Sequence, residues 1–368
     1  MVSTVTANGN RPPIDPTTGM PTRECPVSAP KPRTDPTLGR VAHLKQHWQT
    51  SGFSTDASNI LANSWRRRTE KQYESAWNCW SSWCNTQQTD PLTPTLAGVV
   101  NFLAHEHSQG KSYGSINTYR SALSSILPPI QGHAVGQHPL VVRLLKGVFN
   151  LTPPRPKYSK TWKVSTVLDY LNSLSVNKDL TLLSLSQKLL TLLALVSAQR
   201  SQTLACLDLR YFNFLDDSCV ISVMDLLKTT SPKSGIGQTK LVIPQFEENT
   251  KLCVLTTLKN YLQRTEALRV KSGETKLFLS TRKPHRAVTS STLARWMKFV
   301  LQEAGIDTSI YSAHSFRSAS TSTAFAQGVT LQEILKTADW TNSHTFAHFY
   351  HRKVENPTFG KAVLSCNK

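Results

Sequence analysis

The sequence predicts a mainly α-helical protein with a small antiparallel β-sheet, arranged as two folded domains after an N-terminal arm. Apolar residues recur at three- and four-residue steps over residues 56–150, a Pro-rich run follows at 152–160, and short apolar runs flank a Pro/Ser/Gly turn at 229–237. With 368 residues, 39% of them hydrophobic, the chain is long enough for two cores, which excludes a wholly disordered protein.

The N-terminal arm, residues 1–54, is rich in Pro, Thr, Ser and Gly and has almost no apolar periodicity. We therefore expect it to be disordered, with order starting near Thr55. Its first residues lack the basic and apolar regions of a signal peptide. The longest apolar stretch, Leu180 to Ala198, is interrupted by polar residues, so we expect a buried helix and no membrane partner.

Residues 55–151 are expected to form a compact bundle of four helices. The first helix carries an apolar stripe, and the other three follow Pro94, begin near Ser115 and follow Pro139. Aromatic residues at this spacing are more often core than a base-stacking surface. The stripe consists of Trp65, Thr69, Tyr73, Ala76, Trp77, Trp80 and Trp83.

Residues 163–368 are expected to form a second domain that mixes helix and strand. Leu182 to Ala198 reads as its central buried helix. Short strands are predicted at 219–226, 240–246 and 276–280, and further helices at 253–269, 289–304, 314–327, 331–338 and 344–351.

The charge balance points to a polyanionic partner. Lys and Arg number 42 against 23 Asp and Glu, a formal net charge of +19 that is spread over both halves of the chain. Nucleic acid is the first expectation and an anionic membrane surface the second. The seven cysteines are scattered without a C-x-x-C pair, which makes a disulfide framework or zinc site improbable and fits a reducing compartment.

Two groups of cations are candidate contacts to phosphates. One lies on the polar face of the first bundle helix, and the other lies in the predicted linker, residues 152–162, where three prolines prevent a continuing helix. Clustered cations are by default a solvated face, and their clustering raises the odds of phosphate contact. The two groups are Arg66, Arg67, Arg68 and Lys71, and Arg155, Lys157 and Lys160. Lys233, in the predicted turn between the strands, is a further candidate for DNA contact.

The second domain contains every group that cleavage of a phosphodiester by a protein nucleophile requires. Guanidinium groups suit the charged phosphate oxygens, an oxygen nucleophile must attack in line, and a proton donor must serve the leaving oxygen. A basic pair, His314 and Arg317, shares one face at the start of a predicted helix, where it favours a bound anion. The full ordered set is Arg200, a turn lysine (Lys228, or Lys233 as the alternative), His314, Arg317, Trp340 and Tyr350.

This ordered set resembles the tyrosine recombinase (phage integrase) family over residues 180–351, and the preceding bundle is similar to that family's core-binding domain. The resemblance is nearest to recombinases of eukaryotic DIRS-type mobile elements, on the run R-S-Q-T-L from Arg200 and the pair Phe349–Tyr350. It implies a DNA breaking-rejoining catalytic fold. It also implies duplex DNA as partner and a homotetramer on two DNA sites, formed by exchange of residues 351–368.

The resemblance also assigns roles. Arg200 and Arg317 would clamp the scissile phosphate, and His314 would hydrogen-bond to it and help move the tyrosine proton. Lys228, favoured over Lys233, would protonate the leaving 5′-hydroxyl. Trp340 would occupy the family's His/Trp position, and Tyr350 would attack to form a 3′-phosphotyrosyl bond. The reaction would need no ATP, no metal and no other cofactor, which fits the lack of a Walker-type loop or carboxylate cluster.

Two positions depart from the family pattern. The family usually carries an acid three residues after the first arginine, where this chain has Thr203. The family's tyrosine commonly follows the His/Trp position by nine residues, whereas Tyr350 follows Trp340 by ten and Phe349 stands at nine. The final helix must therefore begin differently if Tyr350 is to reach the phosphate.

Several other interpretations stay open. Arg200 alone could form a salt bridge, for instance to Asp208. The three histidines 344, 348 and 351 share a helical face, but a polar face near DNA is favoured over a metal site. A catalytically silent DNA-binding protein and a tyrosine-dependent topoisomerase are the alternative functions. The expected location is the nucleus for a eukaryotic protein and otherwise DNA in the cytoplasm.

Overall fold

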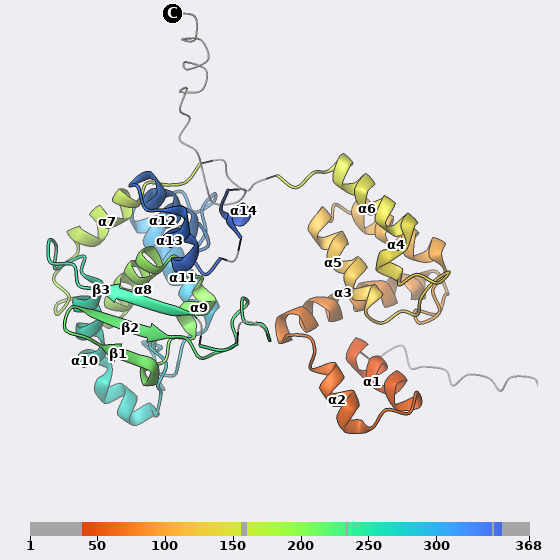
Figure 1. Ribbon diagram of the computed structural model, residues 1–368, viewed down its shortest axis with the longest axis horizontal. Helices are drawn as coiled ribbons and strands as arrows, with labels where there is room; N and C mark the ends of the chain where they lie inside the picture. The colour runs from red at the N-terminus through yellow and green to blue at the C-terminus, as the bar shows by residue number, and fades with distance from the viewer. Residues whose placement is uncertain (1–38, 156–159, 233–234, 238, 341, 348–368) are drawn as a thin grey trace, which may run out of the picture. The chain divides into compact units, whose positions relative to one another are not determined.

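The computed structural model describes residues 39–155, 160–232, 235–237, 239–340 and 342–347 (Figure 1). The chain divides into two compact units between Pro154 and Arg155, inside the expected linker. Each unit has a hydrophobic core of its own. No helix in the described part of the chain combines the length and apolar character needed to cross a bilayer.

The first unit contains the four predicted helices as α3, α4, α5 and α6. Thr95 and Ser112 accept backbone N–H groups and so cap α4 and α5, while His138 and Pro139 start α6. The elements are α1 (Arg40–Thr50), α2 (Thr55–Ala62), α3 (Arg67–Thr86), α4 (Leu96–Ser108), α5 (Tyr113–Ser124), a 3₁₀ turn (Val135–Gln137) and α6 (Pro139–Leu151).

The aromatic stripe of α3 forms the core of the first unit. Trp77 and Trp80 are almost fully buried, and Trp80 packs edge-on against Phe102 of α4 with 5.2 Å between ring centroids. Trp80 also donates its indole N–H to the carbonyl oxygen of Pro91 at 2.9 Å. These rings are therefore unavailable for stacking on nucleic acid bases.

Order begins earlier than the expected Thr55, because α1 lies within the arm that was expected to be disordered. The fully buried guanidinium of Arg40 stacks over Trp65 at 4.5 Å and lies 5.4 Å from the ring of Tyr73. It also donates a hydrogen bond to Ser125 Oγ. An arginine stacked on aromatic rings anchors this helix, and an apolar-periodicity analysis does not detect such an anchor.

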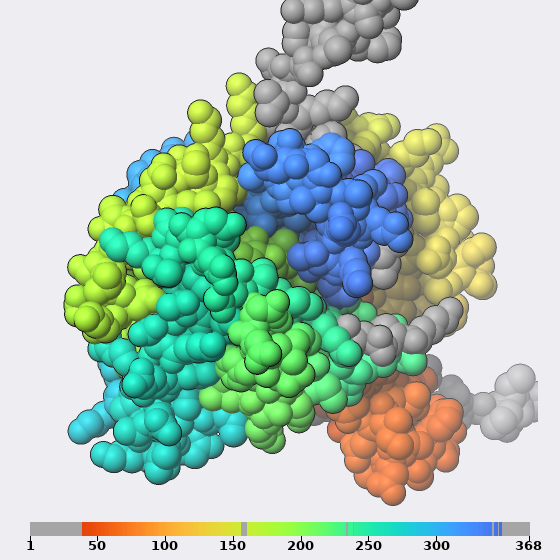
Figure 2. Space-filling view, turned by 60° about the vertical axis from the view of Figure 1, so that its left-hand side comes forward, coloured from red at the N-terminus to blue at the C-terminus, as the bar shows by residue number. Residues whose placement is uncertain are grey.

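The second unit is built around α8, which is buried along most of its length. In the space-filling view little of α8 reaches the surface between its neighbours (Figure 2). The elements are α7 (Val164–Ser173), α8 (Leu182–Ser197), α9 (Ser201–Ala205), a 3₁₀ turn (Leu209–Tyr211), β1 (Phe212–Phe214), β2 (Ser218–Ser222), β3 (Lys240–Pro244), α10 (Val254–Ser272), α11 (Ser290–Glu303), α12 (Ser315–Ala326), α13 (Leu331–Thr337) and α14 (Ser343–Thr345).

The sheet has three antiparallel strands in the order β1-β2-β3 (Figure 1). Cys219 pairs with Ile243 and Ile221 with Leu241, and these four side chains are buried. The two predicted hairpin strands are confirmed, but the third prediction was wrong: residues 276–280 form only isolated bridges, and β1 is the third strand. Both segments are short and apolar, and only pairing with β2 distinguishes them.

The expected linker is too long at its C-terminal end. Trp162 is buried in the core of the second unit, where its ring lies edge-on to Phe316 and its indole N–H donates to Ser315 Oγ at 2.8 Å. Tyr311 donates to the carbonyl oxygen of Lys160. The second unit therefore begins before residue 163.

Candidate active site

Arg317 lies at the centre of the candidate site. It follows the predicted start of α12, and its guanidinium is buried. One Nη donates to the carbonyl oxygen of Ala198 at 2.7 Å and the other to the carbonyl oxygen of Ala338. The guanidinium carbon lies 4.3 Å from the centre of the Trp340 ring. Arg317 thereby joins the segment after α8 to the segment after α13.

Arg200 is presented by the turn that follows α8. The turn begins at Ala198, whose φ of 49° is left-handed and ends the helix. Gln199 is buried and donates to the carbonyl oxygen of Thr337 at 2.9 Å, which holds the turn against the end of α13. Arg200 itself is half-buried and precedes α9. Thr203, at the family's acid position, is buried within α9.

His314 shows that four of the predicted residues come together. Desolvation lowers the pKa of its imidazole, and the positive charges of Arg200, Arg317 and Lys228 lower it further. These cations come from three segments far apart in the sequence, and His314 as a whole residue keeps some contact with solvent. A cluster of like charges is unfavourable by itself and attracts an anion.

Lys228 occupies a tight turn in the loop between β2 and β3. The Thr230 N–H donates to the carbonyl oxygen of Leu227 at 3.1 Å, and the Leu227 N–H donates to Thr230 Oγ1 at 2.9 Å. The Leu227 side chain is buried in the core, whereas Lys228 is exposed. Lys233, the alternative acid, lies outside the described residues.

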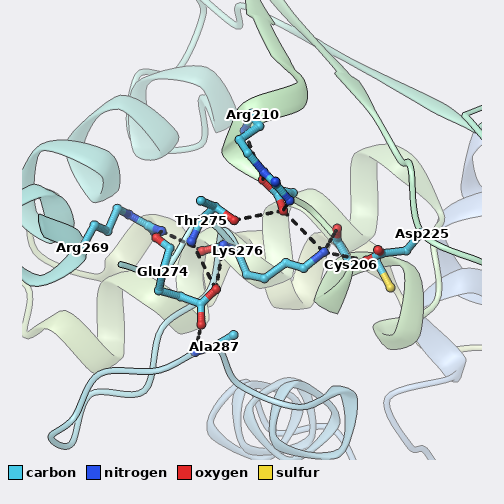
Figure 3. A network of polar contacts seen from close by, with 9 residues as sticks. Cys206, Arg210, Asp225, Arg269, Glu274, Thr275, Lys276 and Ala287 are labelled. Atoms are coloured by element: carbon cyan, nitrogen blue, oxygen red, sulfur yellow. Dashed lines mark hydrogen bonds and ion pairs between the residues drawn. The ribbon is translucent and has the colours of Figure 1, made fainter. Parts of the chain in front are cut away.

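An ion-pair network anchors the chain just before this turn (Figure 3). Lys276 donates to Asp225 Oδ2 at 2.6 Å and to the carbonyl oxygen of Cys206 at 3.2 Å. It also lies 3.6 Å from the buried carboxylate of Asp208. The network therefore fixes Asp225, three residues before Lys228.

Asp208 pairs with residues other than Arg200. Arg210 donates two side-chain hydrogen bonds to it, at 3.0 and 2.8 Å, and Thr275 donates a third. These bonds, those from Arg210 above all, outweigh burial and hold the pKa of Asp208 at about 2. The alternative interpretation, in which Arg200 forms a salt bridge to Asp208, is therefore wrong.

Trp340, which the resemblance assigns to the family's His/Trp position, packs beside Arg317. Its side chain is 9% exposed and belongs to a small cluster with Ala198, Ile334, Ala338 and Phe346. Tyr350 lies outside the described residues, as do the histidines at 348 and 351. Among the described residues, no group of three or more His, Cys, Asp or Glu side chains is arranged to hold a metal ion.

The predicted DNA-contacting cations lie at the surface of their own units. Arg66, Arg67, Arg68 and Lys71 are exposed at the start of α3 in the first unit. Arg66, Arg67 and Arg68 at this helix start oppose the helix dipole, Glu70 in the first turn offsets them in part, and a bound phosphate would relieve the rest. In the second unit Arg155 and Lys160 are exposed, while Lys157 lies outside the described residues.

Asp339 is a residue of this region that the sequence patterns missed. Its Oδ2 accepts hydrogen bonds from Thr229 Oγ1 at 2.6 Å and from Thr239 Oγ1 at 3.1 Å. Thr229 follows Lys228 directly, and Asp339 precedes Trp340 directly. In the sequence Asp339 is simply a polar residue just after a predicted helix. Such residues are too common for the contact with the two threonines to be predicted from them.

Comparisons with known proteins identify the family and the fold. The profile of the phage integrase family matches residues 164–356, more than half of the chain. No curated protein sequence matches. The solved structure of XerH recombinase, a post-cleavage complex with a palindromic difH substrate, is 13% identical with a TM-score of 0.57, covering 88% of each chain.

Two further structures share the fold. The Tn1549 transposon integrase in complex with transposon right end DNA is 13% identical with a TM-score of 0.52, covering 89% of this chain and 99% of that one. A lambda integrase dimer bound to a COC′ core site is 14% identical with a TM-score of 0.50, covering 87% and 79%. The chain therefore belongs to the phage integrase family and is a tyrosine recombinase, an enzyme that cleaves and rejoins DNA.

Proposed function

We propose that this enzyme is a site-specific recombinase that cleaves one DNA strand with Tyr350 and holds it as a 3′-phosphotyrosyl ester. The observation that carries the proposal is that the charges of Arg200, Arg317 and Lys228 all act on the imidazole of His314. Together with desolvation they lower its pKa and favour its neutral form. Such a cluster suits a phosphodiester, whose negative charge would offset the mutual repulsion of the cations.

The chemistry is the one that the resemblance to the family implies for these residues. The Tyr350 oxygen attacks phosphorus and forms a P–O bond, while the bond from phosphorus to the 5′-oxygen breaks. His314 takes up the phenol proton, and Lys228 supplies a proton to the 5′-oxygen, which leaves as a hydroxyl. Arg200 and Arg317 neutralise the non-bridging oxygens. Attack by a 5′-hydroxyl on the phosphotyrosyl bond reverses these steps and rejoins a strand.

The packing of Arg317 supports its part in this scheme. Two of its nitrogens are held by the carbonyl oxygens of Ala198 and Ala338, and Trp340 covers one face. A guanidinium fixed in this way loses little freedom when phosphate binds, which is the condition for electrostatic preorganisation. Trp340 accordingly acts on the phosphate through Arg317 and through its own indole N–H.

The proposal extends to the partners. The enzyme acts as a homotetramer on two duplex sites, with exchange of residues 351–368 between protomers, and belongs to a DIRS-type mobile element, which places it in the nucleus of a eukaryotic host. The solved structure of XerH recombinase bound to a palindromic difH substrate, which shares this fold, supports assembly on DNA. The run from Arg200 and the Phe349–Tyr350 pair support the element type.

Trapping on nicked duplexes tests the proposal. A set of nicked duplexes that covers the DNA on both sides of the gene is incubated with the protein in EDTA. After cleavage, the short fragment between the scissile phosphate and the nick, which carries the leaving 5′-hydroxyl, diffuses away and cannot be rejoined. We expect a covalent DNA–protein adduct that mass spectrometry assigns to Tyr350 and that Tyr350→Phe abolishes without loss of DNA affinity.

The other outcomes separate the alternative functions. Sequence-specific DNA binding without an adduct in either protein would identify a silent DNA-binding protein. Relaxation of supercoiled DNA without recombinant product would identify a topoisomerase. An adduct on a residue other than Tyr350 would overturn the assigned nucleophile.

A further inference from the structure

The loop between β2 and β3 is fastened to the residue that precedes Trp340. The two hydroxyl groups that bond to Asp339 Oδ2 come from separate parts of this loop, because Thr229 lies near its middle and Thr239 lies directly before β3. The contacts span 110 and 100 residues of sequence. One carboxylate oxygen therefore joins the two ends of the second half of the loop and connects them to the end of α13.

The backbone of Asp339 adopts a conformation that has a steric cost for residues other than glycine. Its φ is +54°, in the left-handed region that glycine adopts without steric cost and that most other residues avoid. Asp is among the residues that tolerate this conformation. The position therefore tolerates Asp at some steric cost, and the hydrogen bonds to the two threonines provide a compensating interaction.

The two sequence neighbours of Asp339 contact Arg317, the proposed phosphate-binding arginine. The carbonyl oxygen of Ala338, one residue earlier, accepts a hydrogen bond from Arg317, and Trp340, one residue later, covers the Arg317 guanidinium. On the other side of the contact, Thr229 is the next residue after Lys228. Asp339 thus connects the arginine and the lysine of the candidate site through one short path.

Lys228 is consequently held from both sides. Before it, Leu227 is buried in the core, and after it, Thr229 is bonded to Asp339 at 2.6 Å. We propose that Asp339 is a positioning residue, a latch that keeps Lys228 at the leaving oxygen of the phosphate bound by Arg317. The inference rests on the proposed function, because it assumes that Lys228 is the proton donor. Geometry at this level decides general acid catalysis, since the donor must lie within hydrogen-bond reach.

A sulfur-substituted duplex separates positioning of the acid from a structural role. In this duplex a 5′-bridging sulfur replaces the leaving oxygen. When Tyr350 attacks, the P–S bond breaks and sulfur departs with the electron pair as a thiolate, which needs no proton donor. Loss of Lys228 or of its positioning is therefore bypassed, whereas loss of fold or of DNA binding is not.

We expect Asp339→Gly to form adduct about 10-fold more slowly than wild type on the ordinary duplex and at nearly the wild-type rate on the sulfur duplex. Lys228→Ala should show the same pattern with a larger loss, and Thr229→Val should resemble Asp339→Gly. The matched control is Asp307→Ala, because the exposed Asp307 also bonds to a hydroxyl, that of Ser309, but lies outside the loop.

Either of two kinetic results would overturn the latch. One is an unchanged rate of adduct formation by Asp339→Gly on the ordinary duplex, and the other is an equal loss of rate on both duplexes. Hydrogen exchange gives a readout without DNA: amides of residues 226–232 should exchange faster in Asp339→Gly than in wild type or Asp307→Ala, and unchanged exchange would also contradict the latch. If wild type itself forms no adduct on either duplex, the proposed function fails instead.

Discussion

His314 reports on the charge of the whole candidate site from a single side chain. Desolvation and the charges of Arg200, Arg317 and Lys228 all favour its neutral form. A neutral imidazole is able to accept the phenol proton of Tyr350. The same neighbours make the environment responsive to a phosphate, whose negative charge would raise the pKa of His314 again.

Removal of one neighbouring charge should therefore raise the pKa of His314. We expect Arg200→Gln to move it upward toward the ordinary histidine value of about 6.5, measured by NMR titration of the ring signals and assigned with His314→Gln. An unchanged pKa would mean that Arg200 does not act on the imidazole. Exposed His47, in the first unit, serves as an internal control.

The same shift fixes a dependence of stability on pH. Because the pKa of His314 is lower in the folded protein, the unfolded chain binds more protons between that value and about pH 6.5. The free energy of unfolding should fall as the pH drops through this window, and less so in Arg200→Gln.

The sequence alone could indicate the candidate residues whose order along the chain is characteristic. It could not indicate the contact of Asp339 with the two threonines. Arg200, His314 and Arg317 stand out because the set of cations is ordered. Asp339 does not stand out, since its partners are ordinary threonines more than a hundred residues away. Tertiary hydrogen bonds of this kind leave no period in the sequence.

At the scale of elements, the long helices with apolar periodicity were predictable from the sequence. The elements that depend on tertiary contacts were not. The helices α3 to α6, α8 and α10 to α13 follow from apolar spacing, prolines and capping residues. The first helix was missed because Arg40 anchors it by stacking on aromatic rings. The third strand was misplaced because only pairing with β2 distinguishes β1 from residues 276–280.

The buried helix α8 contains a titratable group that should limit stability. Lys188 is fully buried, and its Nζ has no hydrogen-bond partner among the described residues. Burial, and to a lesser degree the charge of Lys251, lower the pKa of Lys188 to about 8. At neutral pH the folded protein therefore holds an ammonium in an apolar environment.

We expect Lys188→Met to raise the free energy of unfolding of the second unit at pH 7 by roughly 2 kcal/mol. Between pH 8 and about 10.5 the unfolded chain binds more protons than the folded one, so wild type gains stability as pH rises and the advantage of the variant shrinks. Urea unfolding at pH 7 and pH 10 measures this. The exposed Lys178→Met should change little at either pH.

At the scale of the whole molecule, the composition predicts a polyanionic partner. The net charge of +19 is shared by two units, each with exposed cations, as we would expect if both units contact phosphates. DNA affinity should accordingly fall steeply with salt, because binding releases counterions from the duplex. The DNA sequence that the enzyme selects depends on side chains in the grooves, which composition does not reveal.

The central claim is that the cations around His314 neutralise the scissile phosphate, and a duplex with an uncharged methylphosphonate at that position tests it most directly. Arg200→Ala suits the test better than Arg317→Ala, because Arg317 also holds the carbonyl oxygens of Ala198 and Ala338. We predict that Arg200→Ala is inactive on the charged duplex, forms adduct on the neutral one, and that Tyr350→Phe is inactive on both. Equal activity of Arg200→Ala on the two duplexes, whether high or absent, would contradict the account.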